Sequence, residues 1–306
     1  MNLTNGFAGQ FSLGQAGFMA VGAYVVGVFT VPVELRPNVF YAEPMNPLIA
    51  DIQMPLWLAL LVGGLLAALI AFLIGWPVLR LRGDYLAIAT LGFSEIIRIV
   101  ITNAQSWTNG ALGIKDIPAL NDVRYIFIAT AITFLFVTCL INSSYGRAFK
   151  AIREDEIAAE AMGVGLFKHK CMAFMLSAFF AGIGGGLYAT LLGTVDPKNF
   201  LFTLTYNFLL IIVLGGMGSI TGSMLGSIIV TAGLEYLRVF DEPLELFGMA
   251  IPLFRPGFRM VIFSVLLMAC VLFWRKGIMG TNEFTWEKFM AFCKNPVKYF
   301  TQKGAK

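Results

Sequence analysis

Eight strongly apolar segments recur along the chain, and they restrict its fold more than any other feature of the sequence. Most are roughly 18 residues or longer, enough for a helix to cross a lipid bilayer. Backbone groups in lipid must find their hydrogen bonds within the protein. The pattern therefore predicts an all-α membrane protein, a polytopic transmembrane helix bundle with about eight apolar segments, some of them broken by glycine. Their ranges are 14–33, 54–79, 84–104, 122–142, 170–192, 203–217, 219–238 and 258–275.

The distribution of charge predicts which loops share a side of the membrane. Only 13% of the residues are charged, against about 25% in soluble domains. Of the 22 Lys and Arg residues, 14 fall in 80–83, in 142–169 or so and after 274, and seven fall in the other loops. Cytoplasmic loops are enriched in Lys and Arg, so the loop 143–169 and the C-terminus are expected in the cytoplasm. This bias also explains the net charge of +4, and no nucleic-acid partner is expected.

A short charge-dense stretch interrupts the apolar pattern between the fourth and fifth segments. Residues 152–163 contain one basic and four acidic residues in a helix-forming sequence, and they end at Gly163. We expect a short amphipathic helix there, with Ile152, Ile157 and Ala161 on one apolar face. The pattern fits equally a docking site for another protein and an ordinary solvated loop helix.

Two glycine- and serine-containing interruptions stand beside apolar helices near the two ends of the chain, at 6–14 and 215–223. Paired interrupted segments mark the substrate path in many transporters. The candidates for a translocation path here are Gly9, Ser12, Gly14, Gly215, Gly216 and Gly218. Glycines four residues apart indicate close helix packing instead, and they occur as the sets Gly182/Gly186 and Gly218/Gly222/Gly226.

Two opposite charges, Glu95 and Arg98, lie inside the third apolar segment. A charge in a membrane span is a functional-site hypothesis by default, because its burial costs about 3 kcal/mol or more. Their i, i+3 spacing also allows a purely structural ion pair. Both readings stay open, and Gly92 joins these two residues as a path candidate.

The sequence carries none of the motifs of an enzyme that we searched for. It has no phosphate-binding loop of the G-x-x-x-x-G-K-[ST] type, so we expect no ATPase site of its own. Its single histidine, His169, excludes a multi-histidine metal centre, and no catalytic or metal-binding residue is predicted. Acidic residues are scarce within the apolar segments, which argues against a proton relay.

Four stretches, read together, resemble a known family. They are 6–27, beginning Gly-Phe-Ala-Gly-Gln-Phe-Ser-Leu-Gly, 82–98, beginning Arg-Gly-Asp-Tyr-Leu-Ala, 145–163, beginning Tyr-Gly-Arg-Ala-Phe-Lys, and 213–222, beginning Val-Leu-Gly-Gly-Met-Gly-Ser. In this order they are similar to the membrane permeases of branched-chain amino-acid ABC importers, and most similar to the M-type subunit. The third stretch is the most specific, and the four span almost the whole chain.

The resemblance implies a heteromeric importer of leucine, isoleucine or valine in a bacterial inner membrane. Its partners would be ABC ATPase subunits, which bind the ATP, a related H-type permease, an extracytoplasmic amino-acid-binding protein and membrane lipid. No cofactor of this chain is implied. In such importers the equivalent of 153–163 is the coupling helix that fits a groove on the ATPase. The docking candidates carried over are Arg153, Glu154, Asp155, Glu160, Ala161 and Gly163.

The same reading gives a domain organisation and leaves two alternatives. We expect a transmembrane permease domain over 1–280 and a basic amphipathic tail over 281–306. Family members carry a further membrane segment and a half before the first motif, so we expect a truncated gene model or a start at an internal methionine.

The first alternative function is a urea or short-chain amide importer, because that group shares these motifs. The second alternative, from a different class, is a secondary transporter, which would work without ATP.

Overall fold

The computed structural model describes residues 1–81, 83–119 and 123–238, two short strands, and Val261, Ser264, Val265, Met268, 277–280 and Glu283. Most of the eighth apolar segment and all of the tail except Glu283 lie outside the described residues. The chain forms two compact units. The first holds Met1 and Leu3–Leu209, and the second holds Asn2 and Leu210–Lys306.

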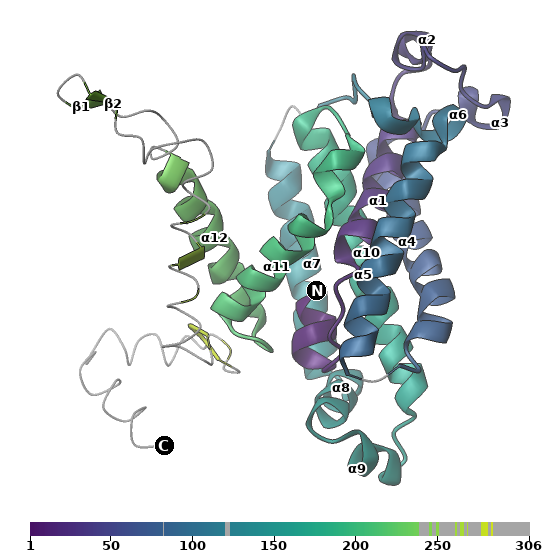
Figure 1. The fold of residues 1–306 in the computed structure, drawn as a ribbon. Helices are drawn as coiled ribbons and strands as arrows, with labels where there is room; N and C mark the ends of the chain where they lie inside the picture. Colours follow the sequence, from purple (N-terminus) through teal and green to yellow (C-terminus); the bar gives the residue numbers. More distant parts are fainter. Residues whose placement is uncertain are drawn as a thin grey trace. The chain divides into compact units, whose positions relative to one another are not determined.

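The first unit is built from helices of very different lengths (Figure 1). Its short elements are a π-helix, η1, three 3-10 turns and four α-helices of four to six residues, and its long helices follow the apolar segments. In chain order they are η1 (Leu3–Phe7), α1 (Gln15–Thr30), η2 (Val33–Leu35), α2 (Arg36–Val39), α3 (Pro47–Ala50), α4 (Leu56–Val78), α5 (Asp84–Asn103), α6 (Gln105–Thr108), η3 (Gly110–Leu112), α7 (Arg124–Asn142), α8 (Ser144–Glu154), α9 (Glu156–Ala161), α10 (Leu166–Leu192), η4 (Pro197–Phe200) and the start of α11 (Phe202–Gly215).

The predicted helical class is confirmed, whereas the predicted count of about eight spans is not. Seven of the eight apolar segments coincide with α1, α4, α5, α7, α10, α11 and α12 (Ile220–Tyr236). Among the described residues, four helices are long and apolar enough to cross a membrane, namely α4, α5, α7 and α10. The number rises to six if two bent pairs each count as one span. These pairs are α1 with Val33–Val39, bent by 96°, and α11 with α12, bent by 119°.

Helix α1 is the centre of the first unit. All but three of its 16 residues are buried, and it packs against α4, α5 and α10. Apolar side chains fill the space around it, with the Phe18 ring edge-on to that of Phe174 at 5.4 Å between centroids. A helix that is apolar all round, as α1 is, belongs in the interior of a bundle.

Glycines allow the backbones of α1, α4 and α10 to touch. A Cβ atom added at Gly22 of α1 would collide with the carbonyl group of Gly182 in α10. A Cβ at Gly182 would lie 3.0 Å from the Gly63 oxygen of α4, and one at Gly63 would lie 3.2 Å from the Gly22 oxygen. A Cβ at Gly186 would lie 2.6 Å from a Val26 methyl group. The close packing predicted for Gly182 and Gly186 is confirmed, and it depends on residues without side chains.

The loops of the first unit gather at two opposite ends (Figure 1). One end holds α8 and α9, and with them Arg147, Lys150 and Arg153. The other holds α2, α3 and α6, where Asn46 N donates to the Ser106 carbonyl and the Asn109 side chain donates to that of Val39. Residues 143–169 and 32–55, which the charge count assigns to different sides, therefore lie at opposite ends of the first unit (Figure 1), whereas most of the tail lies outside the described residues.

Arg36 organises the chain between α1 and α4. Its guanidinium is buried and donates to four backbone carbonyls, those of Val31, Ile49, Ala50 and Ile52, at 2.5 to 3.2 Å. The side chain closes this connection into a compact loop, and five donors on one planar group make Arg suited to that task.

The second unit contains α12 and a minimal antiparallel pair, β1 (Glu245–Leu246) with β2 (Met249–Ala250). Helix α12 packs on the end of α11 through Gly222 and Gly226, because a Cβ at Gly226 would lie 2.6 Å from the Ile211 oxygen. Gly218 was expected on the same helix face, and that prediction is wrong. Gly218 precedes α12, in a loop where its φ is +95°.

Candidate functional site

The charged segment predicted as one helix is a corner between two helices. Helix α8 ends at Glu154, and α9 begins at Glu156. Asp155 lies between them in an extended conformation, and its carboxylate accepts from the backbone N–H groups of Ile157 and Ala158 at 2.8 and 3.1 Å. An N-cap aspartate satisfies donors that a helix start leaves unpaired. The single helix over 152–163 is therefore wrong, because Asp155 starts a new one.

Glycine ends α9, as predicted. Gly163 has a φ of +83°, a conformation that residues with a Cβ rarely adopt. Its N–H donates to the Glu160 carbonyl at 2.9 Å, and Val164 N–H donates to the Ala159 carbonyl at 3.0 Å. These two bonds form a Schellman motif, which fixes the length of α9.

The predicted apolar face of Ile152, Ile157 and Ala161 does not exist. Ile152 belongs to α8 and is buried, whereas the side chain of Ile157 in α9 is 78% exposed. The corner at Asp155 turns the two helices in different directions. Instead, α9 and its end expose Ile157 and Met162, the latter at 84%, with the exposed Glu160 between them. Sequence reasoning missed Met162, although a methionine next to a helix-ending glycine was a visible signal.

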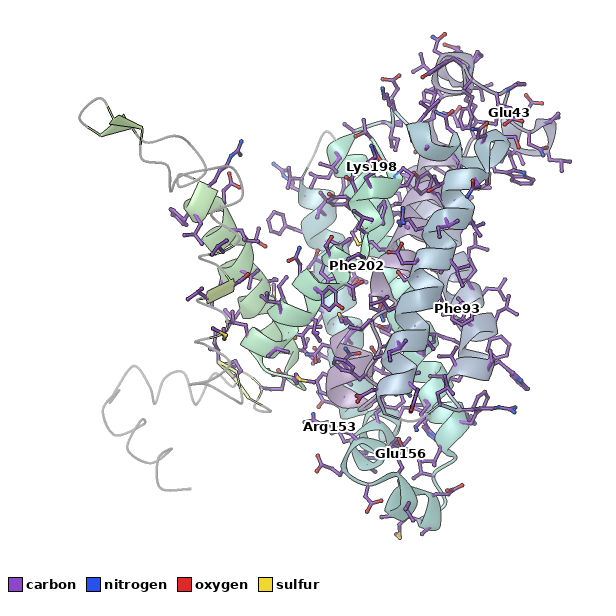
Figure 2. The ribbon with its side chains drawn as sticks, viewed as in Figure 1. Glu43, Phe93, Arg153, Glu156, Lys198 and Phe202 are labelled. Carbon is purple, nitrogen blue, oxygen red and sulfur yellow. The ribbon has the colours of Figure 1, made fainter. Side chains whose placement is uncertain are left out.

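Two polar contacts fasten the corner to the rest of the unit. Lys170 Nζ of α10 lies 2.6 Å from Glu156 Oε1, and the lysine side chain is only 11% exposed. Arg153 Nη1 donates to the Gly6 carbonyl at 2.5 Å. Figure 2 shows Arg153 beside the N-terminal helix, while Glu156 lies further toward α9. Of the six docking candidates, Glu154, Glu160 and Ala161 are exposed, Asp155 and Gly163 shape the helix ends, and Arg153 points inward.

The first interrupted segment lies next to a network of buried polar groups. Ser12 is fully buried, and its backbone N–H and C=O both bond to the Asn5 side chain, at 3.1 and 3.2 Å. Leu13 N–H donates to Thr90 Oγ1 of α5 at 3.0 Å, and Ala16 N–H donates to Thr205 Oγ1 of α11 at 3.3 Å. Gly14 precedes the first residue of α1. Path candidates Ser12 and Gly14 thus lie where α1 begins, inside the unit.

Several buried polar atoms near this network have no partner among the described residues. Both side-chain amide atoms of Gln10 and of Gln15 are unpaired, as is Ser94 Oγ. These three residues are 2 to 3% exposed. A Cβ at Gly17 would lie 3.0 Å from Ser94 Oγ, so Ser94 borders the first turn of α1. An unpaired buried polar group costs about 1–3 kcal/mol. The two glutamines were not among the predicted path residues.

In α5, the charges Glu95 and Arg98 form an ion pair. Arg98 Nε and Nη2 lie 2.8 and 2.7 Å from the same carboxylate oxygen, Glu95 Oε2. The ion pair that their spacing allows is confirmed, while the other oxygen, Oε1, is buried without a partner in the described part of the chain. Gly92 is exposed, and no described atom lies within 4 Å of a Cβ placed there.

The second interrupted segment, in the second unit, is a tight loop from Gly215 to Ser219. Gly216 and Gly218 have φ values of +119° and +95°. Ser219 Oγ accepts from Gly222 N–H at 3.0 Å and caps α12. The Glu283 carboxylate accepts from the N–H groups of Ile220 and Thr221, at 2.7 and 3.1 Å. Glu283 lies in the predicted tail, and its contact with this loop was not foreseen.

Within the described residues, no group of three or more His, Cys, Asp or Glu side chains is placed to hold a metal ion.

The sequence model of one family, described as "Branched-chain amino acid transport system / permease component", matches residues 1–269. The chain belongs to this family. Family membership explains why the four motifs occur together and in this order. It also agrees with the helical fold and with the long apolar helices.

Relatives within the permease family carry names that agree with this description. The high-affinity branched-chain amino acid transport system permease protein LivM of Escherichia coli is 35% identical over 79% of this chain and 60% of its own length. The probable branched-chain amino acid transport permease protein LivM of Methanocaldococcus jannaschii is 26% identical over 91% of this chain and 88% of its own.

A third relative is the permease protein LivH of Escherichia coli, which is 27% identical over 57% of this chain and 63% of its own length. The chain spans about three fifths of the length of the first of these relatives. No solved structure matches the chain.

Proposed function

We propose that the chain is a permease subunit of an ATP-driven importer of branched-chain amino acids. The observation that supports this most strongly is the capped, exposed helix α9 at the end of the first unit, in a member of the permease family. Such a helix carries no chemistry of its own, and its exposed Ile157 and Met162 side chains are of the kind that a partner protein buries.

The docking surface for the ATPase comprises Glu154, Ile157, Glu160, Ala161 and Met162. An ATPase groove would bury the two apolar side chains at the centre and leave the two acidic groups at the rim. Rim charges act mainly on specificity and association rate. Asp155 and Gly163 contribute by fixing the start and the end of α9.

The translocation path is proposed to pass the two interrupted segments. In the first unit it would pass Gly9, Ser12 and Gly14 together with Gln10 and Gln15, whose unpaired amide groups can bond to water or to a passing solute. In the second unit it would pass Gly215, Gly216 and Gly218. Gly92, Glu95 and Arg98 remain proposed path residues on α5.

The remaining assignments extend this proposal. The α8–α9 end and the tail after residue 280 would face the cytoplasm of a bacterial inner membrane, with 1–280 as the permease domain and about eight apolar segments in the bilayer. The partners would be ATPase subunits, an H-type permease, an external amino-acid-binding protein and membrane lipid. ATP would be bound by the ATPases, and this chain would need no cofactor or catalytic residue.

The function is tested by radiolabelled leucine uptake in cells that express the whole gene set, with and without Glu154→Arg plus Glu160→Arg in this chain. Membrane abundance and ATPase co-purification are measured in parallel. The matched control reverses two exposed acidic residues at the other end of the unit, Glu34→Arg in η2 next to α2 plus Glu43→Arg, which Figure 2 labels. We expect the first pair to abolish ATPase co-purification and uptake at normal abundance, and the control pair to keep ATPase co-purification.

Two other outcomes of the uptake experiment would change the proposed function. Uptake of urea or a short amide in place of leucine would keep the importer class and replace the substrate. Uptake that persists without bound ATPase would refute the importer assignment in favour of an ATP-independent transporter.

A further inference from the structure

Arg153 stands in the last turn of α8, three residues before the start of α9, yet its side chain does not extend toward solvent with α9. Its guanidinium reaches the carbonyl of Gly6, 147 residues earlier in the chain, at 2.5 Å. A charged donor on a backbone carbonyl makes one of the stronger hydrogen bonds found in proteins. The contact joins the start of the corner to the π-helix η1.

Gly9 brings the same two segments into contact by a different route. Its φ is +66°, and an added Cβ would lie 3.0 Å from Arg153 Cα and 3.2 Å from Arg153 Cβ and Cγ. The backbone of the interrupted segment therefore rests directly on the backbone of α8. Only glycine combines this φ with this close an approach.

Helix α8 contacts η1 at a further point. Lys150 Nζ lies 6.0 Å from the centroid of the Phe7 ring, which is 2% exposed. On the same helix, Phe149 and Ile152 are buried at 0% and 2% exposure. Helix α8 is thus anchored in the unit along its last two turns, whereas α9 is exposed apart from Ala159 and the Glu156 contact with Lys170.

The anchored segment leads within a few residues to the central helix. After Gly9 the chain passes Ser12, whose backbone N–H and C=O both bond to the Asn5 side chain. The next residue is Leu13, whose N–H bonds to Thr90. Helix α1 begins two residues later, at Gln15. A displacement of α8 therefore acts on residues 6–14, and through them on the first turn of α1.

We propose that Arg153 is a positioning residue that couples the docking helix to the interrupted segment 6–14, and is not itself part of the docking surface. When a partner moves α9, the one-residue corner at Asp155 moves α8 with it. The Arg153–Gly6 bond and the Gly9 contact then carry that movement to the segment at the start of α1. The inference rests on the proposed function for the source of the movement, and the contact itself does not depend on it.

The test uses the full transporter complex with three variants of this chain. Arg153→Leu removes the bond to Gly6, and Gly9→Ala disturbs the same contact from the other side. Arg147→Leu is the matched control, since Arg147 lies on the same helix and is exposed, and among the described residues its side chain donates only to Ser144 within α8. Measurements are ATPase co-purification, ATP hydrolysis, leucine uptake and hydrogen exchange of the amides in 6–14.

We expect Arg153→Leu to keep ATPase co-purification and ATP hydrolysis, to lower uptake by about tenfold, and to speed hydrogen exchange in 6–14. Gly9→Ala should do the same, and the double variant should be no worse than either single one, because both act on one contact. Arg147→Leu should match the unmodified chain in every measurement.

Two results would overturn the proposal. Loss of ATPase co-purification in Arg153→Leu would make Arg153 a docking residue. Unchanged hydrogen exchange in 6–14 would show that the contact positions nothing. If the unmodified complex takes up no leucine, the proposed substrate fails, and the exchange measurement still decides whether Arg153 holds the segment.

Discussion

Replacing Gly22 by alanine adds one methyl group at the point where α1 meets α4 and α10. The new Cβ would collide with the carbonyl group of Gly182. That neighbour is backbone, so no side-chain rotation can make room. The helices must therefore separate, and the close contact between Gly63 of α4 and Gly182 of α10 must widen as well.

The cost can be worked from these contacts. Overpacking a core lowers the free energy of unfolding by about 1–3 kcal/mol and occasionally by more. For a collision with backbone atoms we take a value of about 3 kcal/mol. Alanine recovers about 1 kcal/mol over glycine inside a helix. The net loss is about 2 kcal/mol, which for chains somewhat shorter than this one corresponds to about 4–8 °C in Tm.

The assay is the apparent Tm of the purified protein in one detergent, read by fluorescence-detected size exclusion after heating. Gly184→Ala is the matched control. Gly184 lies in α10 next to this contact, is exposed, and has no described atom within 4 Å of an added Cβ. We expect Gly184→Ala to keep or slightly raise the Tm and Gly22→Ala to lower it. Equal Tm values for the two variants would refute the reasoning.

Three further predictions follow from other contacts. Gln15→Leu removes two unpaired buried polar atoms, so it should stabilise the protein by about 1–3 kcal/mol in the same Tm assay. It should also lower leucine uptake, and unchanged uptake would exclude Gln15 from the proposed path. Asp155→Ala should cost about 1 kcal/mol and speed hydrogen exchange in α9 by about fivefold, whereas Asp155→Asn, which keeps an accepting oxygen, should not. Arg36→Leu removes the hydrogen bonds that the Arg36 side chain donates to four carbonyls, so limited proteolysis should cleave the loop 33–54 faster. The control Arg238→Leu, at an exposed residue, should leave the rate of this cleavage unchanged.

The long helices were predictable because apolar length alone determines them. The segment predicted at 54–79 is α4 at Leu56–Val78, and the one predicted at 84–104 is α5 at Asp84–Asn103. The charge count also assigned 143–169 and 32–55 to different sides, and these two loops lie at opposite ends of the first unit (Figure 1). Both features depend on composition over many residues, and single contacts do not change them.

The details of the candidate site depend on single contacts, and sequence reasoning missed them. Residues 152–163 have good helix-forming sequence throughout, and only the choice of Asp155 as an N-cap divides them. Arg153 was predicted as a docking residue, because a sequence does not reveal that its partner is a backbone carbonyl far away in the chain. Gln10 and Gln15 were given no role, since a sequence does not reveal that a glycine-rich stretch is buried.

The touching backbones of α1, α4 and α10 have a consequence for experiments on motion. Side chains between helices can change rotamer and let the helices slide, whereas backbone against backbone leaves no such freedom. The three helices should therefore keep their mutual distances through the proposed transport cycle. Probes attached to them would serve as a fixed reference frame, against which displacements of α5, α8 and α9 can be measured.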